Sequence, residues 1–318
     1  MAFGSASGLP GEGERLFLML QQFKPNIGGQ AVIEGVMMRG PGYIATAVRE
    51  PSGAIAVQRE RLVSLGDRYP VLKAPLVRGV VAMGEALVYG IKALSFSARA
   101  AGEEEEALSA REIVLTMAAA VAVAVLLFVI IPTFAAKYIH SAVTSPSLLN
   151  LFEGLLRLGI FLGYVVAISF LKDIRRVFEY HGAEHKTIHA YEAGVPLEVA
   201  NVQRYSTLHP RCGTSFLLIV MLISTFVFAF LGWPDLWLRI ASRVLLLPLI
   251  AGVSYEVLRF SGRSRSRWVA WAIAPGLWLQ KLTTREPSDD QVEVAIQALL
   301  AVRPEDNVVE LREVGAGA

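Results

Sequence analysis

This sequence has almost no cysteine and fewer charged residues than a soluble protein. Its 318 residues include one cysteine, Cys212, so a disulfide within the chain is excluded and folding needs no oxidising compartment. Charged residues make up 18% of the chain, against about 25% in soluble proteins. Because 54% of the residues are apolar and the mean hydropathy is +0.48, the composition indicates a membrane protein.

The first 112 residues also lack an apolar run of membrane-spanning length. The apolar run 16–20 is too short for a signal peptide and follows acidic residues, so the N-terminal segment 1–26 is expected to be flexible and cytoplasmic. The net charge of +2 is small, and no basic stripe is present. These absences argue against nucleic acid as a partner.

Membrane-spanning runs of about 20 apolar residues begin only after residue 112. Four segments qualify, 113–135, 155–171, 215–232 and 236–257. Arg157 and Arg239 are expected to reach the membrane surface, whereas Arg243 is expected to pair inside the membrane with a carboxylate such as Glu153. The predicted fold class is an α-helical polytopic membrane protein with about four transmembrane helices.

Lysine and arginine are unevenly distributed between the segments that flank these runs. Segments 172–214 and 259–285 carry six each, whereas 136–150 carries one and the turn 233–236 carries none. Because such residues accumulate on the cytoplasmic side, both termini and the histidine-rich loop 172–214 are predicted to be cytoplasmic. The lipid bilayer is the first expected partner.

The segment 27–100 is predicted to be a small β-containing cytoplasmic module that ends in an amphipathic helix. Residues 31–38, 43–50 and 54–62 have the pattern of short strands, and "EPSGA" between the last two predicts a hairpin. The helix 76–98 has one narrow polar stripe, so it is expected to lie in the membrane interface or to pack on the bundle. An acidic linker, 101–112, leads into the membrane domain, 113–285.

The last part of the membrane domain and the C-terminal region have their own signals. Residues 268–280 are too short and too interrupted by Pro and Gly to span a membrane, and three Trp favour an interfacial or re-entrant segment. Ser288 and Gln291 form a capping box for a soluble helix that ends near Leu300. A soluble helix and tail are therefore predicted over 286–318.

Three of the five histidines lie four residues apart in the stretch "EYHGAEHKTIHAYEAG". A helix that leaves the second span and stops at Gly194 places His181, His185 and His189 within about 80° of one face. Histidines one turn apart can chelate zinc. His181, Glu184 and His185 also form the H-x-x-E-H signature, in which the glutamate activates metal-bound water.

Further ligands for such a metal must come from other segments on the same side of the membrane. His209 and Cys212 precede the third span, and Glu256 ends the fourth. The hypothesis is a divalent metal, most simply zinc, with Glu184 as the catalytic base and with the ligands His181, His185, His189, His209 and Cys212. The same residues also fit a solvated or head-group-binding segment, and a lone cysteine more often serves packing.

Five motifs in the chain resemble the YqhQ family of bacterial membrane proteins. They are "GGQAVIEGVMMRGP", "PLVRGVVAMGEAL", "EYHGAEHKTIHAYEAG", "HPRCGTSFL" and "LQKLTTREPSDDQVEVAI", and the resemblance extends over about residues 27–300. It implies a metal-dependent enzyme in the bacterial cytoplasmic (inner) membrane. It names no substrate and no catalytic residues.

Two functions are therefore open from the sequence. One is a cytoplasm-facing, metal-dependent hydrolase. The other is a non-enzymatic accessory subunit of a membrane complex such as a protein translocon or transporter, in which a metal only braces the loop between spans two and three. The apolar helix 76–98 and the Trp-rich segment favour docking to a partner. A transporter is less favoured, because the spans 113–135 and 215–232 carry no charge.

Overall fold

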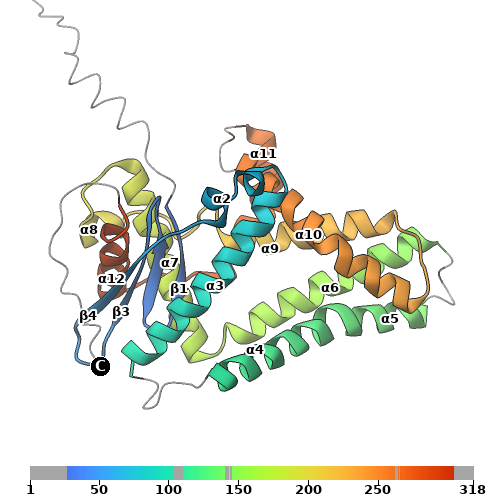
Figure 1. The fold of residues 1–318 in the computed structure, drawn as a ribbon, viewed down its shortest axis with the longest axis horizontal. Helices are drawn as coiled ribbons and strands as arrows, with labels where there is room; N and C mark the ends of the chain where they lie inside the picture. Colours follow the sequence, from blue (N-terminus) through green and yellow to red (C-terminus); the bar gives the residue numbers. More distant parts are fainter. Residues whose placement is uncertain are drawn as a thin grey trace, which may run out of the picture.

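The computed structural model has two parts, a β-sheet covered by helices and an elongated helical bundle (Figure 1). The structure describes residues 27–102, 110–139, 143, 145–261, 264 and 266–303. The predicted flexible N-terminus, most of the predicted acidic linker and the tail beyond residue 303 lie outside the described residues, so those predictions are not tested.

The sheet is an antiparallel meander of β1 (Gly28–Val32), β2 (Gly35–Arg39), β3 (Tyr43–Arg49) and β4 (Ile55–Arg61). The hairpin predicted around "EPSGA" is confirmed, because Arg49 pairs with Ile55. The single strand predicted over 31–38 is wrong, since β1 and β2 form a hairpin with a two-residue turn. Glu34 in that turn has a φ of +50°, a conformation that glutamate seldom adopts. Because glutamate is not a typical residue for such a turn, the β1–β2 hairpin was not predicted from the sequence.

Helices cover both faces of the sheet. Met37 packs on one face against Ala93, and Met38 packs on the other against Ile188 and Leu299. The covering helices are α3 (Val77–Ala100) on the first face and α7 (Lys172–Ala193) with α12 (Asp289–Leu300) on the second. The capping box predicted for α12 is present, with Ser288 as the N-cap. The N-terminal strands and the C-terminal helix thus share one core.

Helix α3 also joins the sheet to the bundle. Packing on the bundle was one of the two positions predicted for this helix. Its first turns pack on α10 (Leu236–Ser261), and a Cβ added at Gly79 would lie 2.7 Å from the Cβ of Tyr255. Farther along, Glu85 is buried and pairs with Arg39 of β2 at 2.5 Å. The polar stripe of the helix therefore faces the sheet module at this point, because a buried carboxylate needs a charged partner.

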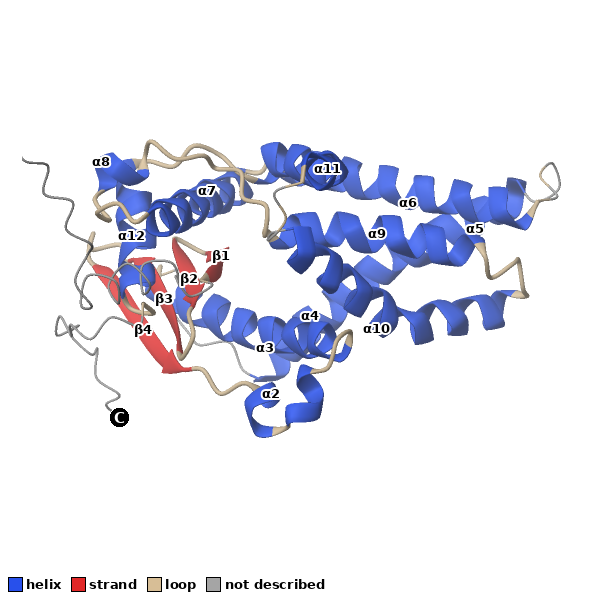
Figure 2. Cartoon of the chain, turned by 90° about the horizontal axis from the view of Figure 1, so that it is seen from above, coloured by secondary structure: helices blue, strands red, loops and turns tan. Residues whose placement is uncertain are grey.

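The bundle contains α10 and three further apolar segments (Figure 2). They are α4 (Ala110–Val125) continued by η2 (Leu126–Ile130) and α5 (Ile131–Ile139), then α6 (Pro146–Ile168) and α9 (Gly213–Ala229). Four described helices are long and apolar enough to cross a membrane, namely Val77–Ala100, Ala118–Ile139, Pro146–Ile168 and Trp237–Ser261, and α9 is a shorter apolar helix. The architecture is compatible with a multi-pass membrane protein. The sequence did not predict α3 among the spanning helices.

The helix predicted to run unbroken from the second span is two helices in the structure. Leu171 is extended between α6 and α7, although neither Gly nor Pro marks the break. Helix α7 then continues without interruption through Gly182 and ends at Gly194, which has a φ of +75°. Gly194 thus ends the helix as predicted. The break allows α7 to leave the bundle and lie on the sheet (Figure 2).

The Trp-rich segment forms one helix, α11 (Arg267–Thr283), so the predicted interruption by Pro and Gly is wrong. Gly276 allows a close approach to α9, because a Cβ there would lie 2.8 Å from the Ser215 hydroxyl oxygen. All three tryptophans of α11 are exposed. The remaining connections contain α2 (Leu65–Arg68), η1 (Pro70–Lys73) and α8 (Val199–Val202).

Candidate metal centre

Helix α7 places its three histidines against the loop that precedes α9. One ring nitrogen of each faces a backbone carbonyl, with distances of 2.7 Å from His181 Nδ1 to Thr283 O, 2.5 Å from His185 Nδ1 to Thr207 O and 2.9 Å from His189 Nε2 to Leu208 O. A carbonyl can only accept, so these nitrogens carry the proton. This leaves the other ring nitrogen of each histidine as the atom that can bind a metal.

The first group of donors combines His181 and His185 with Cys212. Their ligand atoms lie within 4.8 Å of one another, and His181 Nε2 is 3.2 Å from Cys212 Sγ. His185 is 1% exposed and Cys212 is 7% exposed. The sulfur also caps the N-terminus of α9, where it accepts from Thr214 N.

A second group lies farther along α7 and consists of His189, Glu192 and His209, again with ligand atoms within 4.8 Å. The rings of His189 and His209 are 4.7 Å apart between centroids. Burial lowers the pKa of His209 to about 4, despite its hydrogen bond to Glu192. Burial alone would raise the pKa of Glu192, but His209 and Arg211 outweigh it and lower that pKa. The group therefore offers the neutral imidazole of His209, the imidazole of His189 and the carboxylate of Glu192.

Two residues outside the predicted ligand set, Gln280 and Gly182, fix the segments around the site. The Gln280 side chain of α11 accepts from His209 N and donates to His209 O, both at 2.8 Å. Gly182 lets the segment after α11 cross α7, since a Cβ there would overlap the carbonyl oxygen of Arg285. Glu192 was detectable in the sequence, because it lies on the same helical stripe as the histidines. Gln280 carried no such signal.

Glu184 lies on α7 beside the first group, but its carboxyl group contacts the sheet. It is 4% exposed, receives a hydrogen bond from Gly29 N of β1, and belongs to neither group of ligand atoms. Burial raises the pKa of Glu184 to about 7, partly offset by His181 and by the Gly29 N–H. Glu256 is the other acidic candidate. It accepts a hydrogen bond from Arg78 Nε of α3 at 2.7 Å and does not contact the histidines.

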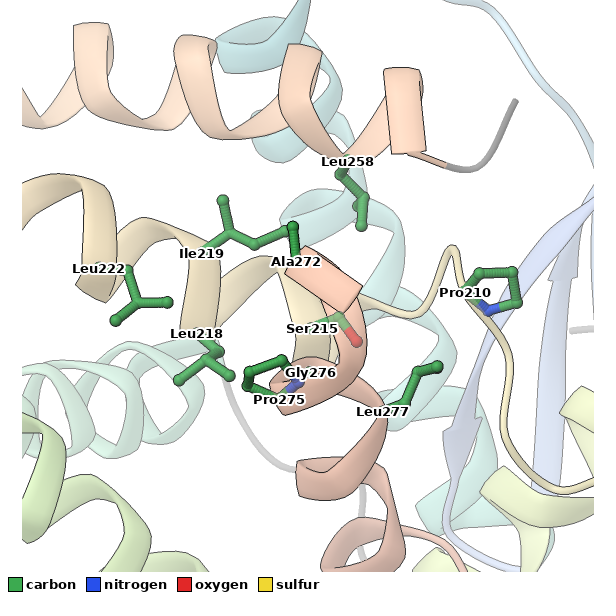
Figure 3. A pocket seen from close by; sticks show the side chains of 10 residues that line it. All are labelled: Pro210, Ser215, Leu218, Ile219, Leu222, Leu258, Ala272, Pro275, Gly276 and Leu277. Carbon is green, nitrogen blue, oxygen red and sulfur yellow. The ribbon is translucent and has the colours of Figure 1, made fainter. Parts of the chain in front are cut away.

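A small cavity lies beside the loop, between α9, α10 and α11 (Figure 3). Its volume of about 20 Å³ is enough for one water molecule. The lining is mostly apolar and includes Pro210, Ser215, Leu218 and Pro275. Pro210 connects the cavity to the loop that carries His209 and Cys212. The cavity is too small for an organic substrate.

The molecule joins an apolar helical bundle to a sheet that is covered by helices. Two groups of side chains that can bind a metal lie near the junction. These features define a membrane-type protein with a candidate metal centre. The chain belongs to the family described as Protein of unknown function (DUF1385), whose model matches residues 74–305. The Uncharacterized protein YqhQ of Bacillus subtilis (strain 168) is 38% identical over 292 residues, which cover 86% of this chain and 91% of that protein. The resemblance to the YqhQ family is thus confirmed. No solved structure matches the chain.

Proposed function

We propose that this chain is a multi-pass protein of the bacterial cytoplasmic membrane that binds Zn²⁺ through His181, His185 and Cys212 on its cytoplasmic side. The observation that carries the proposal is the convergence of three donor atoms within 4.8 Å. Both imidazoles are oriented by backbone carbonyls, which is how metal-binding histidines are usually fixed. A thiolate with two imidazoles suits zinc far better than magnesium or calcium.

The charge distribution and the fold together support the cytoplasmic placement of this site. The basic loop 172–214 contains α7, and α7 packs on the sheet. The sheet module and the zinc ligands therefore share one side of the bundle, which the distribution of lysine and arginine assigns to the cytoplasm.

The primary role proposed for the zinc is structural. His181 and His185 lie on α7, Cys212 begins α9, and His181 also contacts the end of α11 through Thr283. A metal held by these residues joins three elements that adjoin the sheet and the bundle. Such a brace fits the non-enzymatic accessory role, in which the chain serves a larger membrane complex.

Hydrolysis is the second candidate, and the position of Glu184 favours it. When bound by three protein ligands, zinc supplies an activated water in its fourth position. Glu184 immediately precedes His185 and is buried beside His181. It is the carboxyl group of the H-x-x-E-H motif, and it would move the proton at such a water. Its present contact with Gly29 must open for that role.

Metal analysis of the full-length protein in detergent tests the zinc site. After removal of metal and reloading with zinc, His185→Ala is expected to lose one zinc per chain relative to the native protein, whereas exposed Glu198→Gln keeps it. Reloading with Co²⁺ is expected to give a sulfur-to-cobalt absorption band that disappears in Cys212→Ser. A native protein without bound zinc, or an unchanged zinc content in His185→Ala, contradicts the proposal.

A separate measurement distinguishes the structural role from hydrolysis. Glu184→Gln is expected to keep the zinc, because Glu184 is not among the ligand atoms. If the zinc is catalytic, this variant will fail to complement a deletion strain although it is folded and metal-loaded. Full complementation by Glu184→Gln eliminates the hydrolase and leaves the structural zinc.

A further inference from the structure

A second buried polar cluster lies inside the bundle, near the starts of α6 and α10, at the end away from the sheet (Figure 2). Glu153 is 1% exposed and pairs with Arg243, whose Nη2 is 2.7 Å from Glu153 Oε2. This pair confirms the partner predicted from the sequence. Thr133 donates to Glu153 at 3.0 Å, and Arg157 donates to it at the same distance.

Two other arginines of the cluster are buried, against expectation. Arg157 was predicted to reach the membrane surface, but its side chain is 11% exposed and its Nε donates to Phe128 O at 2.7 Å. Arg239 was also predicted to reach the surface and is 6% exposed. The guanidinium of Arg239 stacks on Trp233, with 4.1 Å from its central carbon to the ring centroid.

Arg239 is the member of the cluster whose hydrogen bonds are not satisfied. Its Nε and Nη1 are buried and have no hydrogen-bond partner in the described part of the chain. Glu153 is not available to them, because Thr133, Arg157 and Arg243 already occupy its oxygens. Buried polar groups are nearly always paired, and an unpaired charged one is costly.

The charges of the cluster do not balance either. Arg157, Arg239 and Arg243 contribute three positive charges, and Glu153 contributes one negative charge, so the net charge of these four side chains is +2. Asp235, the acidic residue nearest to Arg239 in sequence, attracts Arg239 through its charge, but it is exposed and its carboxylate accepts from Leu238 N. Charged groups at membrane depth usually mark a functional site. An anion from outside the chain would supply both the missing charge and the missing acceptors.

We propose that Arg239, which lies beside the Glu153–Arg243 pair, binds an anionic phosphate group at this end of the bundle. Arg239 lies three residues, or about 4.5 Å along the axis, from the start of α10. That depth, together with exposed Trp237 nearby, matches the head-group level of a bilayer. Because Trp233 covers one face of the guanidinium, the phosphate oxygens approach in its plane, which is the geometry that arginine uses for phosphate.

The phosphate has two possible sources, a phospholipid head group and a free phosphate ion. This inference rests on the membrane placement proposed above and not on the zinc site. Thermal unfolding of the full-length protein, in neutral detergent and phosphate-free buffer, separates the two sources. The probes are short-chain phosphatidylglycerol, a phosphate-free glycolipid with the same acyl chains, and inorganic phosphate.

Phosphatidylglycerol at saturation is expected to raise the unfolding temperature by about 5 °C, and the glycolipid is expected not to. The shift should vanish in Arg239→Gln and persist in Arg204→Gln, which removes an exposed arginine from the cytoplasmic loop. An equal shift with inorganic phosphate supports the site and assigns it to the soluble ion. Both metal-free and zinc-loaded protein should respond alike.

Three results overturn the proposal. They are an equal response to the glycolipid, no response to either phosphate source, and an undiminished response in Arg239→Gln. If Arg239→Gln fails to fold, Arg239→Lys keeps the charge without the planar donors, and about tenfold more lipid should be needed for half of the shift.

Discussion

The two buried polar clusters of this protein are built on opposite principles. The cluster on α7 collects imidazoles, a thiol and a carboxylate, and its rings are oriented by backbone carbonyls. The cluster inside the bundle collects guanidinium groups around one carboxylate. The first presents lone pairs, which suit a cation. The second presents N–H groups and excess positive charge, which suit an anion.

The two clusters also differ in how much the stability of the protein depends on each of their members. Histidines held by carbonyls are already satisfied through one nitrogen, so the α7 cluster should tolerate the loss of one member. The bundle cluster is charged whether or not a ligand is bound, and Glu153 offsets part of that cost. Removing one member should therefore be far more damaging in the bundle than on α7.

The largest effect is expected from Glu153→Gln. It leaves Arg157, Arg239 and Arg243 buried without a carboxylate, and breaking a buried ion pair in this way typically costs about 3–5 kcal/mol. Thermal or denaturant unfolding in detergent measures the loss. Glu198→Gln, at an exposed position, is the control and should change stability by less than about 0.5 kcal/mol. A small effect of Glu153→Gln would show that the two clusters do not differ as described.

An intermediate effect is expected from Gly182→Ala. The added methyl group overlaps the carbonyl oxygen of Arg285, so the segment after α11 must move at a cost of about 1–3 kcal/mol. Because Thr283 O in that region orients His181, zinc affinity should fall as well.

The matched control is Gly84→Ala in α3, where an added Cβ meets nothing within 4 Å. Replacing glycine there should stabilise the helix by about 0.5–1 kcal/mol and leave zinc binding unchanged. Calorimetric zinc titration and unfolding of both variants provide the comparison. If both glycine variants behave alike, Gly182 is not a close-approach position.

The smallest effect is expected from Cys212→Ser in the metal-free protein. Serine is a good N-cap, so α9 keeps its first turn and the free energy of unfolding should change by less than about 1 kcal/mol. With zinc present, the same variant should lose most of the stabilisation that zinc gives the native protein, because a hydroxyl is a poor zinc ligand. Equal loss with and without zinc would mean that Cys212 serves packing alone.

Local sequence patterns predicted those features that depend on local forces. Apolar runs located three of the four long apolar helices, the Ser288 capping box located the start of α12, and Gly194 located the end of α7. The i, i+4 spacing placed His181, His185 and His189 on one helix face, and the predicted topology placed His209 and Cys212 opposite them. The contacts between these residues agree with that placement.

The errors occurred where packing overrides local preference. Glu34 adopts a positive φ in a tight turn, and its carboxylate pairs with Arg176 of α7. Leu171 breaks the path from α6 to α7 without a breaker residue, and α11 passes through Pro275 as one helix. Arg157 and Arg239 were expected at the surface because their positions near helix ends permit it, yet both face protein in the bundle.

The sequence by itself determined that this chain forms apolar membrane-type helices and that one amphipathic helix carries three histidines on one face, because hydropathy and helical period are properties of neighbouring residues. Only the tertiary structure decided which atoms meet. It placed Cys212 beside His181, turned Glu184 toward Gly29, and left Arg239 without an acceptor. These outcomes depend on contacts between segments distant in sequence, whose geometry no local pattern encodes.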